Sequence, residues 1–244
     1  FLSPAEKLPA AIDAAYEDAE ALVMEIDMDD LDPLEMQKVA LELGVLPAGE
    51  TLQKHLGDDA YATVAQKARE IGIEPAMLDR FRPWFAALTL VQLHLMKMGL
   101  DPNSGVEQRL AVRAASDGKQ IEGLESLREQ LGILAALPDA QQREFLMYSV
   151  EDTERATREI DTMIKAWRSG DVEALDRLLA EGMEKYPKVY RPLTVDRNRK
   201  WIANIERLLD DQDDYLVVVG TLHLVGDDSV IELLEKNGHR IKQH

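Results

Sequence analysis

The residues D-Y-L-V-V-V-G-T-L-H-L-V-G, at positions 214–226, contain both a predicted strand and a candidate site. Residues 215–219 form an apolar, β-branched run that is too short for a helix and is typical of a buried strand. Gly220 is expected to end this strand and to let the backbone turn sharply. His223 then lies just beyond the carboxyl end of the strand, where open α/β sheets build their sites.

Three further segments are expected to be strands. Residues 21–26 (A-L-V-M-E-I) form a near-continuous apolar run, which is typical of a strand covered on both faces. Residues 119–124 precede Glu125, and residues 239–242 close the chain. Because the segments between the strands show helical periodicity, the predicted fold class is α/β (α+β), with a small mixed central sheet enclosed by many helices.

The chain is interpreted as a single domain over residues 1–244, with helical elaborations at about 33–115 and 126–190. Residues 75–98 are the longest piece of the first elaboration and carry a broad apolar face. Core packing is the expected role of that face. A surface that receives a peptide or a partner helix is the alternative, because methionine and aromatic side chains adapt to ligands.

Composition narrows the classes of function. A formal net charge of −18, from 46 acidic and 28 basic residues, argues against binding to nucleic acid or to anionic lipid. No apolar run reaches the roughly 18 residues that a membrane-spanning helix needs. The chain has no cysteine, which excludes disulfides and thiolate metal sites but leaves the compartment open.

Five polar residues are candidates for a site, each with a structural alternative. An ionised Glu25 in an apolar strand needs an exposed strand end, a basic partner or a bound cation. Glu107 and Glu125 each follow a glycine by two residues, and either acid could simply favour the start of a helix. Arg197 and Asn198 open a helix that leads into the 215–219 strand, so both could point at one sheet edge or stand in solvent.

With these motifs in place, the chain resembles the TraB/GumN family, which includes the Tiki metalloproteases and the pheromone-shutdown proteins. It is more distantly similar to the erythromycin esterases and to the haem-binding ChaN proteins. The motifs that carry the resemblance are A-L-V-M-E-I-D at 21–27, G-V-E at 105–107, G-K-Q-I-E-G-L-E-S-L-R-E-Q-L at 118–131, D-R-N at 196–198 and V-V-V-G-T-L-H-L-V-G at 217–226.

The resemblance implies a metal-dependent hydrolase, in particular a peptidase acting on peptide or protein substrates. Its site uses a Gly-x-x-His motif, and the implied metal ligands are His223, Glu25 and Glu107, with catalytic roles for Glu25, Arg197, Asn198 and Glu125. An imidazole and carboxylates suit a manganese, cobalt or zinc ion. A spare glutamate could accept a proton from water, and Arg197 could stabilise an oxyanion.

The resemblance also concerns what precedes the chain. The family carries a first Gly-x-x-His motif that normally ends just before a segment matching Phe1-Leu2-Ser3-Pro4, so we expect these 244 residues to fold but to be poorly active without it. Family members of this architecture are often exported bacterial proteins, which implies an extracytoplasmic location. Two alternatives from other classes are a haem-binding protein with a histidine or tyrosine ligand, and a protein that sequesters a peptide without cleaving it.

Overall fold

The computed structural model describes residues 5–28 and 31–244, without the side chains of 152–158 and 181–185. The chain forms two compact units. The helical unit comprises Asp32–Asp101 and Leu127–Ile160, and the sheet unit comprises Leu2–Leu31, Pro102–Ser126 and Asp161–His244. The interpretation of 1–244 as one domain stays a prediction, and the expectation for residues 1–4 lies outside the described residues.

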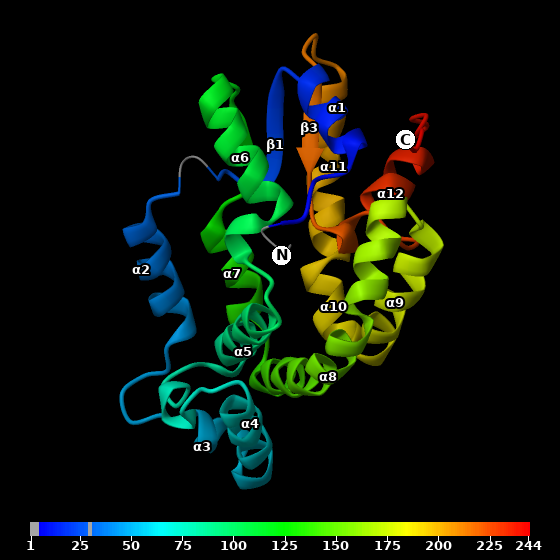
Figure 1. Cartoon of the computed structure of the whole chain (residues 1–244). Coiled ribbons are helices and arrows are strands. Elements are labelled where there is room, and N and C mark those ends of the chain that lie inside the picture. The colour runs from blue at the N-terminus through cyan, green and yellow to red at the C-terminus, as the bar shows by residue number, and fades with distance from the viewer. Residues whose placement is uncertain (1–4, 29–30) are drawn as a thin grey trace. The chain divides into compact units, whose positions relative to one another are not determined.

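The sheet unit is built on three parallel strands, β1 (Ala21–Ile26), β2 (Ile121–Glu125) and β3 (Tyr215–Val218). Their order in the described chain is β2-β1-β3, so the first strand of the sequence is the central one (Figure 1). Met24 lies opposite both Gly123 and Val218. Since all three strands run in the same direction, their carboxyl ends meet at one edge of the sheet.

Apolar side chains cover both faces of this sheet, as the run in β1 predicts. Successive side chains of a strand point to opposite faces, and β1 follows this rule. Leu22 and Met24 join a cluster with side chains of α1 (Ala10–Asp18) and α6 (Val106–Asp117). Val23 joins a second cluster with side chains of α11 (Val195–Leu209) and α12 (Val230–Lys236). The sheet is therefore held between two helical layers.

The helices of the sheet unit are α1 (Ala10–Asp18), α6 (Val106–Asp117), α9 (Val172–Lys185), α10 (Pro187–Leu193), α11 (Val195–Leu209) and α12 (Val230–Lys236). Two 3₁₀ turns, η2 (Pro102–Ser104) and η3 (Thr221–His223), complete it. Helix α6 packs on the sheet, and the helical elaborations at about 33–115 and 126–190 stay a prediction.

The predicted α/β fold class is confirmed, and two details of the predicted sheet are wrong. The described strands are all parallel rather than mixed. Residues 239–242 form no strand, because this four-residue segment, H-R-I-K, offers only Ile241 to a core. Instead, the backbone N–H of His239 donates to the carbonyl of Leu234 at 3.1 Å, which closes the end of α12.

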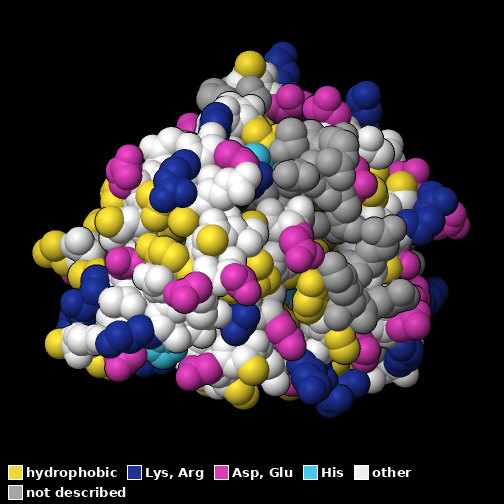
Figure 2. Space-filling view, turned by 90° about the horizontal axis from the view of Figure 1, so that it is seen from below, with side chains coloured by type: hydrophobic (Ala, Val, Ile, Leu, Met, Phe, Trp, Pro, Cys, Tyr) yellow, Lys and Arg dark blue, Asp and Glu magenta, His cyan; other side chains and the backbone are white. Residues whose placement is uncertain are grey.

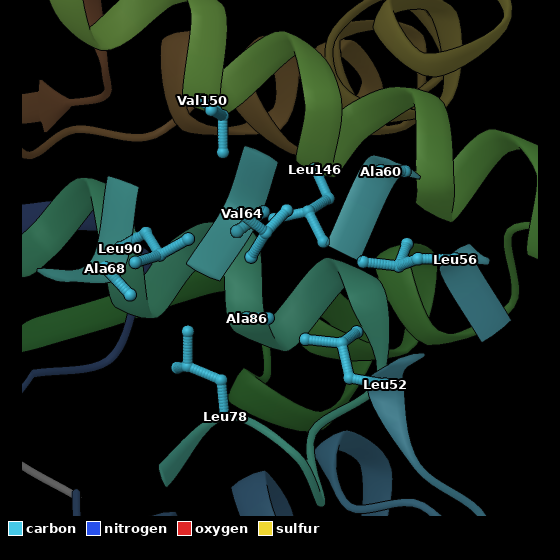
Figure 3. Packing of buried hydrophobic residues seen from close by; sticks show 11 residues of the cluster. Leu52, Leu56, Ala60, Val64, Ala68, Leu78, Ala86, Leu90, Leu146 and Val150 are labelled. Carbon is cyan, nitrogen blue, oxygen red and sulfur yellow. The ribbon is translucent and has the colours of Figure 1, made fainter. Parts of the chain in front are cut away.

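The helical unit contains α2 (Pro33–Gly44), α3 (Leu52–Leu56), α4 (Asp58–Glu70), η1 (Pro75–Met77), α5 (Pro83–Lys97) and α7 (Leu127–Ala135). The long helix α8 (Asp139–Ser169) begins in this unit and ends in the sheet unit. Figure 3 shows the apolar core that α3, α4, α5 and α8 share, which includes Leu52, Leu56, Val64, Leu90 and Leu146.

The helix predicted over 75–98 is interrupted in the structure. Arg82 is extended, as the residue before a proline prefers, and α5 begins at Pro83. Leu78 and Trp84 are buried as expected, but Met77 is 67% exposed and does not belong to the core. Core packing is thus confirmed for Leu78 and Trp84 on this apolar face.

The surface carries both signs of charge. In Figure 2, Lys and Arg side chains stand singly or in small groups among Asp and Glu. None of the helices in the described ranges is both long and apolar enough to cross a membrane.

Candidate functional site

Polar side chains from two strands, from the turn after the third strand and from one helix converge at the carboxyl edge of the sheet. Glu25 lies near the end of β1, and Glu125 is the last residue of β2. His223 ends the 3₁₀ turn that follows β3, and the first turn of α11 adds two further side chains. We call these residues the polar cluster: Glu25, Glu125, Arg197, Asn198 and His223.

Arg197 is the centre of the cluster. Its Nε donates to Glu125 Oε2 at 3.3 Å, and its Nη2 donates to Glu125 Oε1 at 2.5 Å and to Glu25 Oε2 at 2.6 Å. Its Nη1 donates to the carbonyl of Leu193 at 3.0 Å and lies 3.1 Å from His223 Nε2. A guanidinium carries five N–H groups, and these contacts use all five. Arg197 therefore has no N–H left over in this arrangement.

Asn198 sets the tautomer of His223. The Asn198 amide nitrogen donates to the backbone carbonyl of Asp228 at 2.8 Å, which leaves its Oδ1 as an acceptor. His223 Nδ1 lies 2.6 Å from that oxygen, so Nδ1 carries the ring proton. In the neutral ring the lone pair is then on Nε2, where it accepts an N–H of Arg197.

The imidazole of His223 is neutral at physiological pH. Burial lowers its pKa from 6.5 to about 4, because the charged ring would lose its hydration. The carboxylate of Glu25 opposes this shift, and the positive charge of Arg197 adds to it. A neutral ring with its lone pair on Nε2 is the form in which histidine binds a metal ion.

The Glu25 carboxylate is held by the backbone after β3. Its Oε1 accepts the N–H of Gly220 at 2.7 Å and lies 3.8 Å from His223 Nε2. A Cβ at position 220 would lie 3.2 Å from the same Oε1. The φ of Gly220 is −59°, which any residue adopts. The glycine is therefore needed for this close approach, and not, as the sequence suggested, for a special backbone turn.

One aromatic residue of the site was not singled out from the sequence. Trp201 is fully buried on α11, and its ring centroid lies 4.5 Å from that of His223. The Arg197 Cζ lies 4.7 Å above the same indole. The signal was present in the spacing, since Trp201 follows Arg197 by four residues and such residues share one helix face.

Residues 3–243 match the TraB/PrgY/gumN family. The chain belongs to this family.

Two relatives from bacteria are similar to this TraB/PrgY/gumN chain along most of its length. They are the "Uncharacterized protein YbaP" of Escherichia coli (strain K12) and that of Shigella flexneri. Each is 24% identical over 231 residues, which cover 93% of this chain and 81% of the relative. No solved structure gives a significant match.

Glu107 is the predicted site residue that the structure leaves apart. It lies in the first turn of α6, with its carboxylate turned back to within 3.4 Å of the position that a Cβ of Gly105 would take. Within the described chain it makes no hydrogen bond or ion pair with the polar cluster. Its role as a metal ligand stays a prediction.

The donors of the cluster suit a divalent cation in part. Among the described residues, no group of three or more histidine, cysteine or acidic side chains is arranged to hold a metal ion. Two donors lie close together, His223 Nε2 and Glu25 Oε1, and their chemistry fits zinc, cobalt or manganese, with a metal ion at Nε2 taking the place of the Arg197 N–H that this nitrogen accepts. Glu125 is less suited, because both of its oxygens accept from Arg197.

Proposed function

We propose that this TraB/PrgY/gumN chain is a metal-dependent hydrolase, and that it acts as a peptidase. His223 and Glu25 would hold a divalent manganese, cobalt or zinc ion. The observation that carries the proposal is the approach of the neutral His223 Nε2 to Glu25 Oε1, 3.8 Å apart at the carboxyl ends of neighbouring strands. A bound divalent ion supplies a polarised carbonyl and a water acidic enough to attack at neutral pH.

The other members of the cluster orient these two donors. Asn198 keeps the proton of His223 on Nδ1 and thereby directs the Nε2 lone pair into the site. Glu125 holds the guanidinium of Arg197 through two hydrogen bonds. A metal ion at His223 Nε2 would take the place of the Arg197 Nη1–H there, so the proposal makes Arg197 the residue that positions Glu25 and leaves this N–H to stabilise an oxyanion.

Exposure indicates where a substrate would approach. The side chain of Glu25 is 22% exposed, whereas that of Glu125 is 1% exposed. The side of the cluster formed by Glu25 is therefore the one that solvent reaches, and a scissile carbonyl would enter there. Glu125 lies behind Arg197 and is removed from solvent.

Metal binding is the first test. Calorimetry with Mn²⁺, Co²⁺ and Zn²⁺ is expected to show about one ion per chain, with affinity at least about tenfold lower in His223→Gln and Glu25→Gln. His239→Gln, at a histidine outside the cluster, is the matched control. The measurement is repeated on a chain extended through the upstream motif that the family resemblance implies. If neither protein binds an ion, the proposal is wrong.

Peptide cleavage is the second test. Mass spectrometry of a peptide mixture is expected to show products that disappear with a chelator and return with the metal. Binding of intact peptides without products would instead support a sequestering protein. The proposed extracytoplasmic location rests on the family resemblance, and fractionation of cells that express the tagged precursor checks it, since recovery in the cytoplasm would contradict it.

A further inference from the structure

Two charged or polar groups of the site rest on one aromatic ring. Trp201 places its indole against both the guanidinium of Arg197 and the imidazole of His223. A guanidinium over an aromatic face is a favourable cation–π arrangement. The His223 ring is tilted by 45° relative to the indole, within the range of centroid distances that aromatic pairs prefer.

A second tryptophan shows what packing alone looks like in this chain. Trp84 is also fully buried, and its Nε1, like that of Trp201, has no hydrogen-bond partner among the described residues. Its ring contacts that of Phe85, at a centroid distance of 5.4 Å. Both indoles thus leave a buried N–H unsatisfied, but only the ring of Trp201 supports groups of the polar cluster.

The hydrogen bonds of the cluster leave one kind of motion open. The N–H groups of a guanidinium lie in its plane, so a contact on the face of Arg197 adds a restraint against tilting to that of its hydrogen bonds. His223 is bonded at Nδ1 and Nε2, which leaves rotation about the line between these atoms. An indole face packed against both groups blocks the tilt and the rotation together.

We infer that Trp201 is a positioning residue of the proposed metal site, which fixes the plane of Arg197 and the ring angle of His223. It keeps His223 Nε2 in place beside Arg197 and Glu25 without touching metal or substrate. The role in metal binding rests on the proposed function, whereas the ordering of the two side chains is a property of the metal-free chain.

Nuclear magnetic resonance of the full ¹⁵N-labelled chain tests the ordering without metal. The signals are the Nε–H of Arg197 and the ring nitrogens of His223, identified by their loss in Arg197→Lys and His223→Gln. In Trp201→Leu, we expect the Arg197 Nε–H to exchange with water at least about tenfold faster and the His223 ring to populate both tautomers. Trp201→Phe, with a smaller ring, is expected to give intermediate values.

Trp84→Leu is the matched control, since it removes an equally buried indole from the helical unit. It should lower stability and leave both signals unchanged. The inference would be overturned if both signals were unchanged in Trp201→Leu. If only Trp201→Phe folds, unchanged signals in that variant would overturn it. Changes of the same size in Trp84→Leu would also overturn it.

Metal affinity separates this inference from the proposed function. Calorimetry with Co²⁺ is expected to show about tenfold weaker binding in Trp201→Leu and none of this loss in Trp84→Leu. Absence of Co²⁺ binding by both the unsubstituted chain and the chain extended through the upstream motif would reject the proposed function, and the resonance signals would still decide whether Trp201 orders Arg197 and His223. Full Co²⁺ affinity in Trp201→Leu would overturn its role in positioning the ligand.

Discussion

The two units of this TraB/PrgY/gumN chain bury different chemistry. The helical unit buries leucine and valine, as in the cluster around Leu52, Leu90 and Leu146. At its strand ends, the sheet unit buries an arginine, a carboxylate and an imidazole. Apolar burial is favourable by itself, whereas a buried charge is tolerated only when it is paired and hydrogen-bonded. The loss of stability from a substitution in the helical unit therefore depends on the apolar volume that is removed. The loss from a substitution in the polar cluster depends on the partners that are left without a hydrogen bond or an ion pair.

The largest expected effect is the removal of Arg197. Arg197→Met leaves the buried Glu125 without its partner and is expected to lower the free energy of unfolding by about 3–5 kcal/mol. Denaturant unfolding followed by circular dichroism measures this. In the double variant Arg197→Met, Glu125→Leu, the loss should be smaller than the sum of the single losses, because no charge is left unpaired at position 125. Additive losses would show that the pair is not coupled.

A core substitution in the helical unit is expected to affect stability alone. Leu146→Ala removes a fully buried side chain and should cost about 2–5 kcal/mol in the free energy of unfolding. Leu41→Ala, at a half-exposed leucine of the same unit, should change it by no more than about 0.5 kcal/mol. Both variants should bind divalent metal as the unsubstituted chain does. A loss of metal affinity in Leu146→Ala would contradict the expectation that substitutions in the core of the helical unit affect stability alone.

Acid is expected to act on the polar cluster through His223. The pKa of this histidine is about 4 in the folded chain and 6.5 in the unfolded chain, so the unfolded chain binds the proton first as the pH falls. The contribution of the neutral ring to the free energy of unfolding is complete above pH 6.5, declines between pH 6.5 and 4, and is lost below pH 4. The total loss is about 3 kcal/mol.

Unfolding of the metal-free chain over this pH range measures the effect. The slope of the free energy of unfolding against pH gives the number of protons taken up on unfolding. Between pH 4 and 6.5, this number should be smaller by close to one in His223→Gln. An unchanged slope in His223→Gln would mean that this imidazole does not gain a proton on unfolding.

The smallest effect distinguishes two glycines of the sheet unit. Gly220→Ala brings a methyl group to within 3.2 Å of Glu25 Oε1 and should weaken metal binding while costing about 1 kcal/mol of stability. Gly118 has a φ of +73° and open space around it, so Gly118→Ala should cost a similar amount through backbone strain, with metal affinity unchanged. Equal metal affinity in both variants would place Gly220 outside the site.

Much of the sheet could be predicted from short apolar runs. The bounds predicted for β1 are those of the structure, because residues 21–26 form a near-continuous apolar run. β2 begins two residues later than predicted and includes Glu125. The strand predicted at 239–242 is wrong, since four alternating residues are too few to distinguish a strand from a tail that follows a helix. The parallel direction of the strands was not predicted, because pairing depends on contacts remote in sequence.

The residues of the candidate site could be predicted from the sequence, but the contacts between them could not. Glu25, Glu125 and His223 follow from strand ends, and Arg197 from the start of a helix that leads into β3. That all five N–H groups of Arg197 are used depends on the carbonyl of Leu193 and on the tautomer of His223, neither of which a sequence pattern reveals. Trp201 was missed because a buried tryptophan on a helix is typical of ordinary packing.

The order of strands in the sheet has a consequence for synthesis of the chain. β1 emerges from the ribosome early, but Ala21 pairs with Tyr215, which is made almost last. Until then one edge of the apolar central strand has no neighbour, and such an edge invites pairing with other chains. Helices α3, α4 and α5 are complete long before β3 appears. We therefore expect nascent chains stalled before residue 215 to aggregate through 21–26, and charged substitutions there to prevent it.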